Sequence, residues 1–139
     1  MLKGIKFRIY PNRIQKTIIQ KTFGCTRVVY NSGLALRIDE YKNGNSIGYK
    51  ETNSMLTTMK KSDEYSWLKE ADSIALQQSL RDLDKAYKNF FAKRASFPKF
   101  KSKHNHNKSY RMLVAIFVLL ANTSNSRSSD TLKPRFQCL

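Results

Sequence analysis

Residues 5–10 of the opening segment alternate between two faces, a pattern typical of a half-buried β-strand. Pro11 ends the alternation, because proline has no amide hydrogen to donate to a neighbouring strand. We therefore expect a strand over residues 2–10. One face of this strand is apolar and the other carries cations and a tyrosine: Ile5, Phe7 and Ile9 on the first, Lys6, Arg8 and Tyr10 on the second.

The next stretch has helical spacing and is interrupted by a glycine. Asn12 is a good N-cap for a helix whose apolar face continues to Phe23. Gly24 predicts a turn after that helix, and a second helix over Thr26–Lys42 would end at Gly44. Two helices joined in this way are compatible with a helix-turn-helix, although any helical hairpin gives the same pattern.

Two more helices are predicted further along the chain. The shorter covers Lys50–Lys61, and the longer runs from an N-cap at Asp72 to about Arg94. The longer helix carries leucines and aromatic residues at helical spacing over about four turns. The lone Trp67 is interpreted as a core side chain. The predicted core combines three apolar stripes, on Ile14–Phe23, Leu34–Tyr41 and Leu76–Phe90.

Basic residues are also spaced regularly. A second stripe on the longest helix consists of Arg81, Lys85 and Lys88. Bases at the end of a helix complement its dipole, so helix stability and phosphate contact explain this stripe equally well. Alternation then returns over residues 97–103 and predicts a second strand. Its lysines would stand about 7 Å apart, close to the spacing of successive phosphates. They are Lys99, Lys101 and Lys103.

The distribution of charge points to a nucleic-acid partner. The 139 residues include 26 lysines and arginines but 10 aspartates and glutamates, so the net charge is +16. Residues 1–38 hold eight bases and no acid, and residues 85–129 hold ten bases and no acid. Segregated positive charge is typical of phosphate-binding proteins, with a merely solvated basic surface as the alternative. We expect neither a membrane nor a small-molecule substrate as the partner.

No group of residues is typical of an enzyme. The sequence has no nucleophile–base pair and no glycine-rich phosphate loop. His104 and His106 have no cysteine or acid beside them, and Asp82 and Asp84 lack a third carboxylate. We therefore expect no catalytic residue, metal or cofactor. Two widely separated cysteines, and no apolar run of about 20 residues, favour a cytoplasmic protein associated with the nucleoid.

Four strings along residues 1–111 are distinctive in combination: FRIYPN, FGCTRVVYN, SWLKEADSIALQQSLRDLDKAYKNFF, and FPKFKSK followed by SYR. Together they resemble the N-terminal region of the OrfB-type transposon proteins, also called TnpB. Full-length members of that family are RNA-guided DNA nucleases, in which this region begins a wedge β-barrel, inserts a helical lobe and returns to the barrel. The family's RuvC-like nuclease domain and zinc ribbon are not recognisable here. The resemblance therefore implies binding of guide RNA and target DNA without cleavage.

The expected fold is mainly α with short β-strands. A helix-turn-helix-like lobe over residues 12–94 would lie between strands 2–10 and 97–103 of an incomplete wedge barrel, and residues 1–111 would form the family domain. The tail, residues 112–139, does not resemble the family. Read one base earlier, codons for Asn122–Lys133 permit KYIKLPKLGYIK, which contains a motif expected after SYR. We interpret the tail as a frameshift product; a lineage-specific tail that packs as a short helix is the alternative.

We expect DNA, guide RNA or both to contact basic, polar and aromatic side chains near the two ends of the family domain. Two other interpretations stay open: a standalone helix-turn-helix DNA-binding regulator, and a pseudogene product without function. The candidate contact residues are Lys6, Arg8, Tyr10, Arg27, Asn31, Arg81, Lys85, Lys88, Lys99, Lys101, Lys103, Tyr110 and Arg111.

Overall fold

The computed structural model describes residues 6–105, 108–111 and 135–137. The chain divides into two compact units, one formed by Met1–Ile19 with Leu113–Leu139 and the other by Gln20–Met112. The first unit is called the terminal unit and the second the helical unit. Most of the interpreted tail, residues 112–134 and 138–139, lies outside the described residues.

The terminal unit contains one short pair of strands. Strand β1 (Lys6–Arg8) pairs antiparallel with β2 (Arg135–Gln137), and Phe7 is opposite Phe136. The strand predicted over residues 2–10 is therefore confined to three residues in the described part of the chain. Two three-residue strands are too short to make up the flanking barrel that we expected, so that part of the predicted fold is not shown.

Helix α1 (Arg13–Lys42) is one continuous helix of 30 residues. Its start agrees with the predicted cap. The backbone N–H of Gln15 donates to Asn12 Oδ1 at 2.9 Å, and the backbone N–H of Asn12 donates to Gln15 Oε1 at 3.1 Å. The turn predicted at Gly24 is wrong, because the helix passes straight through that residue. The chain first reverses at Gly44, which has a φ of 84° and ends the helix as expected.

The continuity of α1 has a simple energetic reason. A glycine inside a helix costs only about 1 kcal/mol relative to alanine. Cys25 and Val29 follow Gly24 on one helical face and are buried, and Tyr30 and Leu34 extend this buried surface. Burying each of these larger side chains contributes about 1.5–3 kcal/mol, which outweighs the single glycine.

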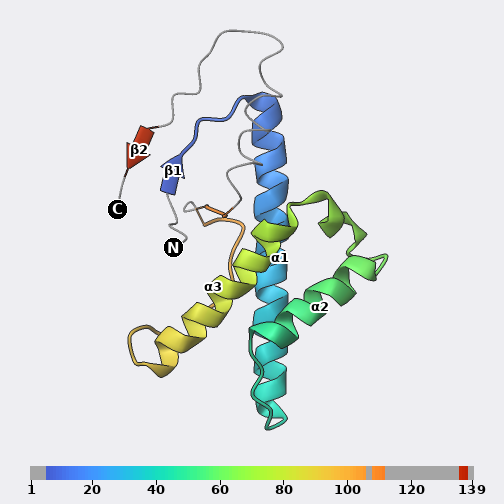
Figure 1. Ribbon diagram of the computed structural model, residues 1–139, viewed down its shortest axis with the longest axis vertical. Helices are drawn as coiled ribbons and strands as arrows, with labels where there is room; N and C mark the ends of the chain where they lie inside the picture. Colours follow the sequence, from blue (N-terminus) through green and yellow to red (C-terminus); the bar gives the residue numbers. More distant parts are fainter. Residues whose placement is uncertain (1–5, 106–107, 112–134, 138–139) are drawn as a thin grey trace. The chain divides into compact units, whose positions relative to one another are not determined.

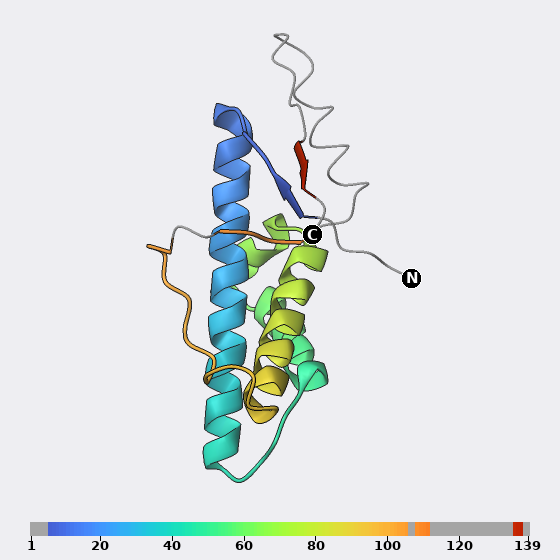
Figure 2. The same cartoon turned by 90° about the vertical axis from the view of Figure 1, so that its left-hand side faces the viewer.

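The remaining helices agree with the sequence pattern. Helix α2 (Tyr49–Lys61) is followed by a short 3-10 helix, η1 (Ser66–Glu70), and by α3 (Ser73–Phe91). The side chain of Asp72 caps α3 as predicted, accepting a hydrogen bond from the Ile74 amide at 3.2 Å. Helices α2 and α3 both lie on the same side of α1 (Figures 1 and 2).

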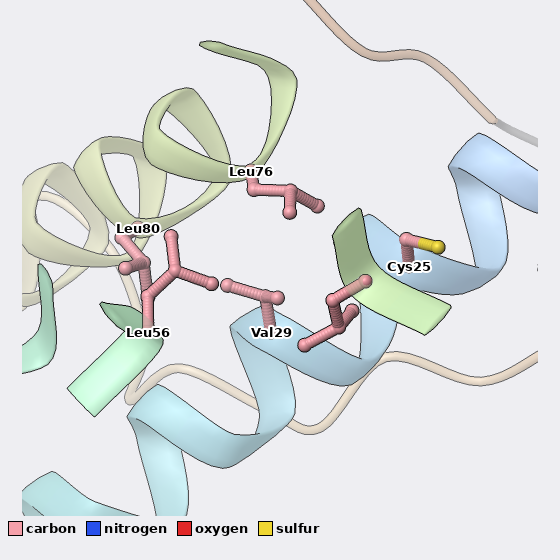
Figure 3. Packing of buried hydrophobic residues seen from close by; sticks show 6 residues of the cluster. Cys25, Val29, Leu56, Leu76 and Leu80 are labelled. Atoms are coloured by element: carbon pink, nitrogen blue, oxygen red, sulfur yellow. The ribbon is translucent and has the colours of Figure 1, made fainter. Parts of the chain in front are cut away.

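The core of the helical unit lies between these helices. Val29 from α1, Leu56 from α2 and Leu76 and Leu80 from α3 point toward one another (Figure 3). A second cluster combines Tyr30, Leu34, Leu83 and Tyr87. Gly33 makes room for this packing, because a Cβ atom there would stand 2.9 Å from Leu80 Cδ2 and 3.0 Å from Leu83 Cδ2.

Four residues predicted for the core are exposed instead. Ile14 and Tyr41, near the two ends of α1, are each 75% exposed. Ile18 is 43% exposed. Trp67 is 40% exposed, and its Nε1 donates to the Glu64 carbonyl at 2.9 Å. The neighbouring Leu68 is the side chain of η1 that is fully buried.

The segment after α3 does not form the strand predicted over residues 97–103. It runs back along α1 (Figure 2), and its backbone pairs with a side chain: the Lys101 amide donates to Asn31 Oδ1 at 2.8 Å, and Asn31 Nδ2 donates to the Lys101 carbonyl at 3.0 Å. In the described part of the chain, no strand lies beside this segment to form backbone hydrogen bonds with it. A turn at Ser102–Asn105 then ends the extended conformation.

The substitution Gly24→Ala tests the continuous helix. Apart from the adjacent residues and backbone of its own helix, no atom lies within 4 Å of the position of the new Cβ, so the change should raise the free energy of unfolding by about 0.5–1 kcal/mol through helix propensity. Gly33→Ala is the matched control. Gly33→Ala should raise the free energy of unfolding by a smaller amount, or lower it, because the added methyl group meets two buried leucines. Thermal unfolding followed by circular dichroism measures both. A destabilised Gly24→Ala variant would indicate a turn at residue 24.

Candidate nucleic-acid interface

The basic stripe predicted on α3 is present on the surface that faces α2. The guanidinium carbon of Arg81 lies 4.9 Å from the centre of the Tyr49 ring, a cation–π contact. Lys85 and Lys88 continue the stripe, and both are exposed. Together with Asp84 these four residues line an open depression of about 410 Å³. We call the surface formed by these five residues the α3 stripe.

An acid inside the α3 stripe neutralises part of its charge. Asp84 contacts Lys88 Nζ at 2.8 Å and Arg37 at 3.1 Å. Burial opposes ionisation of Asp84, but the hydrogen bonds from Lys88 and Arg37 outweigh burial and hold its pKa below the ordinary value. Lys88 is therefore already paired, whereas Lys85 has no carboxylate partner among the described residues.

Arg37 is a structural residue that the sequence did not single out. Its guanidinium donates twice to the Ile47 carbonyl, at 3.0 and 2.8 Å, and lies 4.2 Å from the centre of the Tyr87 ring. Its side chain is only 10% exposed. Arg37 thus connects α1, the loop before α2 and α3. Its position in the basic N-terminal part of the chain suggested phosphate contact as readily as a buried ion pair, so the sequence alone could not identify this role.

The segment after α3 carries three of the predicted lysines, and they differ in environment. The Nζ of Lys101 lies 4.3 Å from the centre of the Tyr30 ring. Desolvation lowers the pKa of the Lys101 ammonium, and the charge of Asp82 partly opposes this shift. All three lysines are exposed, and Lys99 and Lys103 have no acidic partner within the described ranges. The turn after Lys101 means that the three lysines do not form the straight row that we expected.

Three predicted contact residues hold this segment in place. Asn31 uses its amide oxygen and nitrogen on the Lys101 backbone. The Tyr110 ring packs edge-on against Phe23, with 5.5 Å between ring centres, and burial raises the pKa of its hydroxyl. Arg111 pairs with Asp82 at 3.0 Å. These contacts place the three side chains in the framework of the interface.

A small basic pocket lies between α1 and this segment. It has a volume of about 100 Å³, and Arg27 from α1 and Lys101 and Lys108 from the segment supply its positive charge. The sequence suggested Arg27 and Lys101 as contact residues but not Lys108, although Lys108 belongs to the same acid-free run. The remaining lining residues are Phe23, Thr26, Ser102, Asn105 and Ser109. We call this the α1 pocket.

Lys6, Arg8 and Tyr10 belong to the terminal unit rather than the helical unit. Arg8 and Tyr10 are exposed. The structure therefore brings Arg27 close to Lys101, and Arg81 close to Lys85 and Lys88, and it assigns the N-terminal candidates to a separate unit.

The described ranges contain no group of three or more histidine, cysteine or acidic side chains that could hold a metal ion. Cys25 is buried in the core, and burial raises the pKa of its thiol. No helix within these ranges is long and apolar enough to cross a bilayer.

Comparison with known proteins gives consistent matches. A family model for the helix-turn-helix domain of OrfB proteins matches residues 1–46. A protein of Streptomyces pristinaespiralis named as an RNA-guided DNA endonuclease is 40% identical over 102 residues, which cover 73% of this chain and 25% of that protein. The Escherichia coli protein named as the RNA-guided DNA endonuclease InsQ is 41% identical over 111 residues, which cover 79% of this chain and 27% of that protein.

A third relative is much shorter. The virulence protein VsdF of Salmonella dublin is 39% identical over 114 residues, which cover 75% of this chain and 96% of that protein. The chain thus spans about a quarter of the two endonuclease relatives, but nearly all of VsdF.

The Asn31 contact can be tested by substitution. Asn31→Ala removes both hydrogen bonds to Lys101, and we expect it to lower the free energy of unfolding by about 1–2 kcal/mol. We also expect faster hydrogen exchange of the Lys101 amide. Asn53→Ala in α2 is a suitable control, because it gives the same gain in helix propensity without touching the segment. Equal exchange of the Lys101 amide in both variants would contradict the role assigned to Asn31.

Proposed function

Because this chain belongs to the OrfB family of transposon proteins, we propose that it binds DNA, guide RNA or both through phosphate contacts, and that it does not itself cleave nucleic acid. The names of two relatives, RNA-guided DNA endonucleases, support a nucleic-acid partner. The match covers only about a quarter of those relatives, so their cleavage activity is not transferred to this chain.

One observation about charge carries this proposal. The two acids that lie nearest in sequence to the basic C-terminal run are already occupied, Asp82 by Arg111 and Asp84 by Arg37 and Lys88. The other cations of the α3 stripe, the α1 pocket and the segment after α3 have no carboxylate partner in the described part of the chain. Unneutralised positive charge is available to release counterions from a phosphate backbone. These cations are Arg27, Arg81, Lys85, Lys99, Lys101, Lys103 and Lys108.

A self-standing binding protein is a second candidate. VsdF supports it, since a relative composed almost entirely of the matched region exists as a named protein. In this candidate, the chain binds DNA directly and needs no guide RNA. Measuring affinity for the same sequence as duplex DNA, single-stranded DNA and structured RNA separates it from the first candidate.

Salt dependence tests phosphate-led binding. If about six phosphates are neutralised, the logarithm of the association constant should fall with the logarithm of salt concentration with a slope of about −4 to −5. Lys99→Gln with Lys103→Gln should reduce the magnitude of that slope by about 1.5. Lys61→Gln, at the exposed end of α2, is the control and should change it little. The proposal is refuted if no nucleic acid binds at low salt, or if affinity does not depend on salt.

Incubation with a nucleic-acid target tests the absence of cleavage. Purified protein with magnesium, guide RNA and end-labelled target DNA should leave the DNA intact, because the described residues provide no cluster of acids for metal ions. Heat-denatured protein provides the background. Product that exceeds this background and disappears with a chelator would show that the chain is a nuclease.

A further inference from the structure

The α1 pocket is built by residues from distant parts of the sequence. Arg27 lies on α1, whereas Lys101 and Lys108 lie on the segment after α3. The segment is attached on both sides of the pocket: Asn31 binds the Lys101 backbone, and Arg111 pairs with Asp82. Described residues on either side of the pocket are therefore joined to the helical core.

The chemistry of the lining suits an anion. Three cations supply charge, Ser102 and Ser109 supply hydroxyl groups, and no acidic residue among those that the structure describes lines the pocket. The Thr26 hydroxyl already donates to the Phe23 carbonyl at 3.0 Å. Asp82 acts electrostatically on Lys101 but is paired with Arg111. The Lys101 ammonium faces the Tyr30 ring and is partly desolvated. An anion beside it would provide the opposite charge that the described residues leave open.

The size of the pocket limits which anion fits. Its volume of about 100 Å³ corresponds to about three water molecules. Pockets for whole drug-sized ligands are usually about 300–1,000 Å³. A single tetrahedral phosphate fits this volume. Arg27 offers the fork of donors that binds two phosphate oxygens at once.

We propose that the α1 pocket binds one phosphate group, with Arg27, Lys101 and Lys108 as its cationic ligands. The phosphate is a diester of the bound nucleic-acid backbone, which rests on the proposed function. The hydroxyl groups of Ser102 and Ser109 donate to the remaining phosphate oxygens. The pocket then sets the position of the strand along the basic surface, because a recessed site accepts one phosphate at a time.

Titration with inorganic phosphate tests the pocket without any nucleic acid. Phosphate replaces chloride at constant ionic strength while backbone amide resonances are recorded. We expect saturable shifts confined to residues of the α1 pocket, such as Arg27, Ser102 and Lys108. These shifts should disappear in the double variant Arg27→Gln/Lys108→Gln and persist in Lys85→Gln/Lys99→Gln. Shifts of equal size over the α1 pocket and the α3 stripe, or no shifts, would overturn the proposal that the α1 pocket binds phosphate.

A double-mutant cycle tests whether the phosphate belongs to nucleic acid. Arg27→Gln and Lys108→Gln should each weaken oligonucleotide binding about tenfold. The double variant should weaken binding much less than hundredfold, because both side chains hold the same phosphate. Lys85 and Lys99 do not share a pocket, so their double variant should show the product of the single effects. Melting curves confirm that the variants are folded.

The outcomes separate the two proposals. If the wild-type chain binds no oligonucleotide but shows the confined phosphate shifts, the nucleic-acid function fails and the pocket serves a free anion. If oligonucleotides bind but the Arg27 and Lys108 effects multiply fully, the function stands and the shared-phosphate site is wrong. Confined shifts together with coupled effects support both.

Discussion

The helical unit depends on the packing of α3 against α1 at Gly33. Leu80 and Leu83 occupy the space that a larger side chain at this position would fill. Ser79 reinforces the contact by donating to the Thr26 carbonyl at 2.9 Å. Once α3 lies in this position, its apolar seam is covered, and its two flanks face α2 on one side and the segment after α3 on the other.

Each flank of α3 contributes one acid, and each acid has a structural partner. Asp84 joins Arg37, which also binds the loop before α2, and Asp82 joins Arg111 at the end of the described segment. Ion pairs at a surface contribute little to stability, but Arg37 is nearly buried and makes several contacts. The acids therefore hold the surrounding elements together, and they leave most of the nearby bases without a carboxylate.

The same framework explains why the candidate contact residues fall into two groups. Asn31, Tyr110 and Arg111 lie where the segment meets the helices, and their polar or aromatic groups are engaged there. Arg27 and Lys108 stand beside these contacts and face the α1 pocket. The first group sets the shape of the surface, and the second provides its available charge. A substitution in the first group is therefore expected to act on binding through folding, whereas a substitution in the second acts on the ligand directly.

The sequence by itself determined the helices α2 and α3, the caps at Asn12 and Asp72, the end of α1 at Gly44 and the excess of positive charge, because spacing, capping and charge are local properties. Tertiary structure decided the rest. Burial of Cys25 and Val29 carried α1 through Gly24, where local preference predicted a turn. The amide of Asn31, 70 residues away, replaced the missing strand partner of Lys101. Which bases are paired depends on how α1, α3 and the segment meet, and this arrangement is not encoded in the spacing of any one element.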